Sequence, residues 1–213
     1  MCRFSFLSLA VLLMLVGCNT PTKNNEQKQN TIAQDTLSVN DIQKVDSLTT
    51  VIKGFVKAYS SKDAKKVNSY VHPELGLTII YRPGVADHFT KVSGIDFDKP
   101  VPENFPYPIL TNSYALKYEK LPEYDCGTEK WDKFGFFCDT TSHPNQVSTI
   151  VAFQKEFNEQ VVSAKELQDI EANEEHSYRV IITLSDPLVF HVQNFNGRWY
   201  ITTLDRAYAG CDA

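Results

Sequence analysis

Apolar residues recur at three- and four-residue steps early in the chain, after a long polar stretch. Between residues 45 and 59 they are Val45, Leu48, Val51, Ile52, Phe55, Val56 and Tyr59. This spacing places them on one face and predicts a helix. A shorter helix is predicted over residues 62–70. His72-Pro73 ends it, because the residue before a proline avoids the helical region.

The middle of the chain contains one clear strand pattern between long stretches without periodicity. Residues 77–81 read Leu-Thr-Ile-Ile-Tyr, a strand composition, and the following Arg-Pro-Gly signals a turn. Residues 93–112 contain four prolines and are predicted to be loop or edge. Residues 121–146 are also predicted to be irregular. Loops of this length are uncommon unless they are functional or cross-linked.

The last third of the chain changes from a helical to a strand pattern. Residues 147–170 have helical periodicity, and Ser163 begins a capping box that predicts a break near that residue. Residues 178–184, 188–193 and 198–204 then have strand composition, with the hairpin cue Asn196-Gly197 before the last run. This order predicts an α+β fold, in which N-terminal helices pack on a curved antiparallel sheet beside a long cross-linked loop region.

The first eighteen residues have the layout of a secretory signal, with Arg3 followed by an apolar run over residues 5–16. The run is too short to span a bilayer, which needs about 20 apolar residues. Its end, Leu15-Val16-Gly17-Cys18, resembles the lipobox of bacterial lipoproteins. The resemblance implies cleavage before Cys18, a diacylglycerol on its thiol and an acyl chain on the new amine. The alternative is an ordinary signal peptide that contains a cysteine.

Three segments follow from this reading. Residues 1–17 are a signal peptide, and residues 18–40 are a lipidated cysteine with a polar tether that cannot bury enough apolar surface to fold. Residues 41–213 form a single globular domain. The net charge is −5 and no basic run is present, which disfavours nucleic-acid binding. No acidic residue follows Cys18 directly, and by the lipoprotein resemblance this implies the periplasmic face of the outer membrane.

Two short segments and the order of the elements resemble the NTF2-like cone fold. The segments are residues 55–64, Phe-x-x-Ala-Tyr-Ser-Ser-Lys-Asp-Ala, and residues 197–201, Gly-Arg-Trp-Tyr-Ile. The resemblance implies a long first helix and a shorter second helix against a strongly curved sheet. It also implies a pocket at the open end of the cone, lined by aromatic side chains and a few polar groups. The long middle departs from the compact family pattern.

The cysteines are predicted to form a disulfide, which is the default in an exported protein. Cys126 and Cys138 flank a loop-like stretch and are the favoured pair. Cys211 is then left over, and pairing of Cys211 with either of the other two stays open. Their spacing, with His143 nearby, matches no usual zinc pattern.

Candidate chemistry centres on His72, Glu74 and His88, which could share a proton near neutral pH or hold a metal. Tyr81 and Asp205 complete the tentative pocket. The alternatives are that His72 caps a helix end, Glu74 is solvated and Asp205-Arg206 is a surface ion pair. His191 is expected on the solvent face or as a satisfied core group.

Motifs for a phosphate-binding loop, a serine-hydrolase elbow and a zinc protease are absent from the sequence, which disfavours those enzyme classes. The first functional hypothesis is a membrane-tethered, non-catalytic envelope module that binds a small ligand or an envelope protein, without a cofactor or metal. The second is a small envelope enzyme with an acid–base pocket. The third is a structural protein that dimerises through its sheet face.

Overall fold

The computed structural model describes residues 39–111, 113–157, 162–184, 186–208 and 211, with side chains from residue 47 onward. These residues belong to one compact unit. The predicted signal peptide, Cys18 and nearly all of the predicted tether lie outside them. Among the described residues, none of the helices is both long and apolar enough to cross a membrane.

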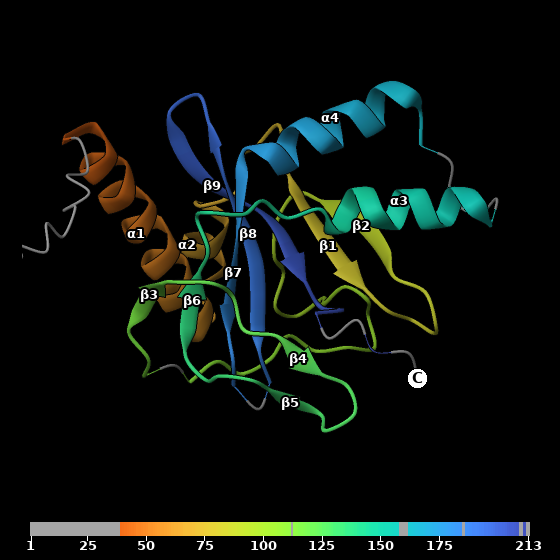
Figure 1. The fold of residues 1–213 in the computed structure, drawn as a ribbon, viewed down its shortest axis with the longest axis horizontal. Coiled ribbons are helices and arrows are strands. Elements are labelled where there is room, and N and C mark those ends of the chain that lie inside the picture. The colour runs from red at the N-terminus through yellow and green to blue at the C-terminus, as the bar shows by residue number, and fades with distance from the viewer. Residues whose placement is uncertain (1–38, 112, 158–161, 185, 209–210, 212–213) are drawn as a thin grey trace, which may run out of the picture. The chain divides into compact units, whose positions relative to one another are not determined.

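A seven-stranded sheet forms the centre of the domain, in the order β2-β1-β9-β8-β7-β6-β3 (Figure 1). Its strands are β1 (Leu77–Tyr81), β2 (His88–Val92), β3 (Leu116–Tyr118), β6 (Phe136–Cys138), β7 (Ser177–Ile182), β8 (Leu188–Phe195) and β9 (Arg198–Asp205). The pairs β1–β9 and β3–β6 are parallel, and the other pairs are antiparallel. A separate two-stranded sheet joins β4 (Tyr124–Asp125) to β5 (Lys130–Trp131).

The first face of the sheet is covered by α1 (Val39–Ser60) and α2 (Ala64–Asn68). The apolar stripe predicted for the first helix packs here, because every third or fourth residue of α1 points to the sheet. The largest buried side chains of this main core include Leu48, Ile52, Phe55, Tyr59, Leu77, Ile79, Ile182 and Phe190.

The second face is covered by α3 (Gln146–Glu156), α4 (Ala164–Glu175) and the β4–β5 hairpin. Successive strand residues point to opposite faces, so Ile79 enters the main core while Ile80 packs with Val147 and Ile150 of α3. Farther along the same face, Ile181 and Val189 pack against Trp131. Both faces are therefore buried over part of the sheet.

The α+β class with helices packed on a mostly antiparallel sheet is confirmed, and β1 has the predicted residues. The break near Ser163 is also confirmed, because its hydroxyl accepts the backbone N–H of Glu166 at the start of α4. The prediction that residues 121–146 are irregular is partly wrong. Residues 136–138 form β6 within the main sheet, and 124–125 pairs with 130–131.

The structure corrects the favoured disulfide. Cys126 is bonded to Cys211, across 85 residues of sequence and with a Cα–Cα distance of 5.6 Å. Cys138 is a buried free cysteine on β6, and burial raises the pKa of its thiol to about 12. The favoured Cys126–Cys138 pair is wrong because Cys138 points into the main core beside Val180, whereas Cys126 lies next to β4 outside that core.

Candidate functional site

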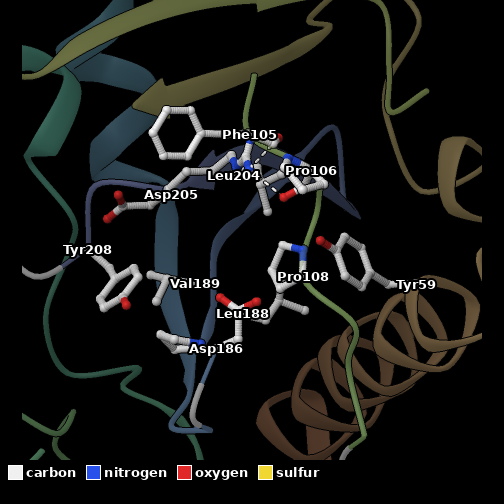
Figure 2. Close-up of a pocket in the computed structure, with 12 residues that line it drawn as sticks. Tyr59, Phe105, Pro106, Pro108, Asp186, Leu188, Val189, Leu204, Asp205 and Tyr208 are labelled. Atoms are coloured by element: carbon white, nitrogen blue, oxygen red, sulfur yellow. Dashed lines mark hydrogen bonds between the residues drawn. The ribbon is translucent and has the colours of Figure 1, made fainter. Parts of the chain in front are cut away.

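A pocket of about 340 Å³ lies where β8 begins and β9 ends (Figure 2). Leu188 and Val189 from β8 and Leu204 from β9 line it where the strands end. The Tyr59 and Tyr208 rings lie on opposite sides of these strand residues, as Figure 2 shows. Residues from the last turn of α1, the proline-rich loop and the C-terminal segment therefore meet at one end of the sheet.

Tyr59 occupies the last turn of α1 and is almost fully buried. Burial raises the pKa of its hydroxyl, so the group stays neutral across the physiological range. This hydroxyl lines the pocket and has no hydrogen-bond partner among the described residues. A buried polar group in this state has an unmet hydrogen bond, and a ligand could supply it.

Arg206 fixes the proline-rich wall of the pocket. Its guanidinium donates to the carbonyl oxygens of Val101, Phe105 and Pro106. It also lies over the Tyr107 ring, 4.9 Å from the centroid, and its backbone N–H donates to the carbonyl of Ile80. Because these carbonyls already occupy the guanidinium, Arg206 shapes the pocket more than it offers a free charge.

The opposite wall is held by the C-terminal segment. Tyr208 stacks on Trp131 with ring centroids 5.8 Å apart and meets Tyr124 edge-on at 6.2 Å. The Cys126–Cys211 bond and a hydrogen bond from Arg82 to the Cys211 carbonyl hold the chain just beyond it. The disulfide thus ties the segment that carries Tyr208 to the β4–β5 hairpin.

Two carboxylates differ sharply in their environment at this pocket. Asp186 is exposed at the rim, whereas Asp205 is buried and contacts Arg179 at 2.5 Å. Burial raises the pKa of Asp205, and the close Arg179 guanidinium opposes part of this rise. The interpretation of Asp205-Arg206 as a surface ion pair is wrong, because Asp205 pairs with Arg179 inside the domain.

His72 lies far from this pocket. Its ring packs edge-on against Phe195 and Tyr200, each with centroids 4.9 Å away. Its Nδ1 accepts the backbone N–H groups of Glu74 and Leu75, so it stabilises the turn after α2. Glu74 is exposed.

Tyr81 and His88 face each other across β1 and β2, with ring centroids 6.3 Å apart. The register aligns β1 with β9 so that Tyr81 falls beside Arg206, whereas His72 contacts Tyr200. At about 3.3 Å per residue along a strand, Tyr200, which contacts His72, and Arg206, which lies beside Tyr81, are roughly 20 Å apart. The structure therefore does not bring His72 and Glu74 together with His88, and of the five tentative residues only Asp205 lines the pocket.

The sequence patterns had suggested other roles for the residues that line the pocket. Tyr59 belonged to the apolar stripe of a helix, and Phe105 and Pro106 to a loop. The position of Arg206 directly after the last strand was a possible signal, because the loops at the ends of strands often carry functional residues. Among the described residues, no cluster of three or more His, Cys, Asp or Glu side chains could hold a metal ion.

Comparison of the chain with protein-family models, with curated proteins and with solved structures finds no match, so the pocket geometry is the basis for any function.

Proposed function

We propose that this chain is a lipid-anchored cell-envelope protein whose domain binds a small organic ligand at the end of the sheet. The pocket between Tyr59 and Tyr208 carries the proposal. Its volume of about 340 Å³ falls within the range of roughly 300–1,000 Å³ that is typical of small-molecule sites. Its walls are held by the hydrogen bonds of Arg206 to the proline-rich loop and by the Cys126–Cys211 disulfide. Such preorganisation lowers the entropy lost on binding.

The lining indicates the chemistry of the ligand. Aromatic and aliphatic groups from Tyr59, Phe105, Leu188 and Tyr208 offer apolar contact, and the neutral Tyr59 hydroxyl offers one hydrogen bond. The Arg206 guanidinium is occupied by carbonyls, and the exposed carboxylate at the rim is Asp186. A flat or ring-containing ligand with a polar group directed at Tyr59 fits this arrangement.

The anchoring part of the proposal rests on the sequence. Cys18, the apolar run before it and the polar tether resemble a bacterial lipoprotein, and the Cys126–Cys211 disulfide fits an oxidising compartment. The tether would hold the domain near the periplasmic face of the outer membrane. The expected mark is a diacylglyceryl group on Cys18, seen by mass spectrometry of the N-terminal peptide and lost in Cys18→Ala.

An NTF2-like cone is the finer fold that we infer. A 22-residue first helix and a 5-residue second helix lie against the sheet, and two strands of eight residues close the chain. A pocket at one end of the sheet, lined by aromatic residues, agrees with this inference. The strands inserted between residues 116 and 138 depart from the compact pattern.

Titration with the fluorescent probe anilinonaphthalene sulfonate tests the pocket directly. Phe105 is 55 % exposed and lines the pocket, so Phe105→Ala removes an aromatic wall without disturbing the core. Loss of one aromatic contact of about 1 kcal/mol predicts roughly fivefold weaker binding.

The matched control is Phe153→Ala on α3, which removes a similarly exposed ring, 43 % accessible, away from the pocket. We expect this variant to bind the probe as the unmodified chain does. Equal weakening in both variants, or none in Phe105→Ala, would refute the placement of the site.

A further inference from the structure

A row of polar side chains crosses five strands on the second face of the sheet. The strand registers align Arg179 of β7 with His191 of β8, His191 with Thr203 of β9, Thr203 with Thr78 of β1, and Thr78 with Lys91 of β2. Aligned residues on neighbouring strands point to the same face. The next row along the sheet, from Ile181 through Val189 to Ile80, is mainly apolar.

Four residues of this row line a second cavity, of about 80 Å³, which lies on the opposite face of the sheet from α1: Thr78, Lys91, His191 and Thr203. Val147 of α3 and Ile170, Asn173 and Glu174 of α4 roof it. A single water needs only about 10–15 Å³ of such space, so the cavity has room for a small molecule. The β8–β9 register shifts next to His191, and both Thr202 and Thr203 line the cavity as a result.

One fully buried polar group lines the cavity without a hydrogen-bond partner among the described residues. His191 is 1 % exposed, and its Nε2 has no hydrogen-bond partner among the described residues. This contradicts the expectation that His191 is solvated or satisfied. Thr203, Thr78 and Lys91 line the same cavity, and of these Thr203 is buried, Thr78 is half-buried and Lys91 is exposed. Native proteins rarely leave a buried polar group unpaired, so the His191 Nε2 atom indicates that the cavity holds a hydrogen-bond partner.

The balance of charge around the cavity favours an anion. Lys91 contributes a positive charge at the mouth, and the threonines contribute hydroxyl donors. The one carboxylate, Glu174, already accepts the backbone N–H groups of Val147 and Ser148 at the start of α3. Burial also raises the pKa of Glu174, which favours its neutral form.

We propose that the cavity under α3 and α4 binds a small oxyanion, of the size of inorganic phosphate or acetate. Lys91 supplies the counter-charge, and the hydroxyls of Thr78 and Thr203 and the imidazole of His191 donate hydrogen bonds to the oxyanion. The roof holds α3 and α4 together through Glu174, so the anion site lies at the junction of these helices with the sheet. The site is separate from the pocket at the end of β8 and β9.

Calorimetric titration of the full chain with inorganic phosphate, and separately with acetate, tests this proposal at constant ionic strength. We expect saturable one-to-one binding of at least one of the two oxyanions, with a Kd of about 1 mM or lower. Lys91→Met is expected to weaken binding by roughly tenfold, because a hydrogen bond to a charged group is lost. Thr203→Val keeps the shape of the side chain and should also weaken binding, since it removes only a hydroxyl.

Lys130→Met is the matched control, because Lys130 is an exposed lysine on β5, away from the cavity. It should bind the anion as the unmodified chain does. Three outcomes would overturn the proposal: no saturable binding of either anion, unchanged binding in Lys91→Met, or equal weakening in Lys130→Met. The first would mean that water alone fills the cavity. Phe105→Ala should leave anion binding intact, which separates this site from the proposed function.

Discussion

Gly54 lies in the middle of α1, where the Tyr70 ring comes against the helix backbone. A Cβ at this position would collide with the Tyr70 hydroxyl and approach its Cζ atom to 2.8 Å. The ring is also held edge-on against Phe55, with centroids 6.4 Å apart. Glycine inside a helix is less favourable than alanine by about 1 kcal/mol, and the close approach of Tyr70 explains why a glycine occupies this position.

Gly54→Ala is therefore expected to destabilise the domain. Alanine improves helix propensity by about 1 kcal/mol, but overpacking costs typically 1–3 kcal/mol. In a Tyr70→Ala background the collision is gone, so the same change should stabilise by about 1 kcal/mol. Urea unfolding of the four chains measures both effects. A destabilising Gly54→Ala in both backgrounds would contradict this explanation.

His191 gives the domain a dependence of stability on pH. Burial lowers the pKa of the imidazole well below 6.5, and Arg179 adds to this. The unfolded chain binds a proton near pH 6.5 that the folded chain does not. Stability is thus fully present above pH 6.5 and is lost as pH falls, by about 1.4 kcal/mol per pH unit until the folded pKa is reached.

Urea unfolding of the unmodified chain and of His191→Gln, at several values between pH 7 and pH 5, tests this. The other charged groups near the imidazole, Arg179, Lys91 and Glu174, are present in both chains. Glu174 has a raised pKa and acts in the opposite direction at the acidic end, so the difference between the two slopes isolates His191. Identical slopes would show that His191 is not the group responsible.

At the level of elements, the features that the sequence predicted correctly are those that neighbouring residues determine. The cap at Ser163 and the turn at Asn196-Gly197, whose backbone φ angles are 51° and 79°, follow from neighbouring residues. The edge strand β2 was missed, because His-Phe-Thr-Lys-Val pairs on one side only and has weak strand character. Strand β6 was missed since its three residues lie inside a loop-like stretch.

The candidate sites were less predictable, because they join residues that are far apart in the sequence. Arg179 and Asp205 are 26 residues apart, and Arg206 bonds to carbonyls about a hundred residues earlier. No spacing rule connects such residues. The disulfide between Cys126 and Cys211 was one of the pairings left open. The Cys126–Cys138 pair was favoured because these cysteines flank a short loop-like stretch, but closeness in sequence does not decide which cysteines meet in the fold.

The disulfide connects two elements, and its removal should loosen one wall of the pocket. Closing a loop of this length contributes about 4–5 kcal/mol in the chain-entropy model, so Cys126→Ser with Cys211→Ser should lower stability by up to that amount. Peptide mapping without reductant should yield a linked Cys126–Cys211 peptide and a free Cys138. A Cys126–Cys138 peptide would contradict the structure.

At the level of the whole molecule, one sheet carries two separate cavities. The first lies at the strand ends, between α1 and the disulfide-bonded C-terminal segment. The second lies on the second face of the sheet, under α3 and α4. Both are possible because the sheet is buried on its two faces, with alternate residues of each strand directed to different layers.

The most direct test of the proposed function is native mass spectrometry of the full chain, extracted from the envelope of its own cells. We predict an additional noncovalent mass, of the size of a small organic molecule, on the unmodified chain and on Phe153→Ala. Phe105→Ala should lose most of it. A chain that carries no such mass and also fails to bind anilinonaphthalene sulfonate, or a mass retained fully by Phe105→Ala, would contradict ligand binding at the end of the sheet.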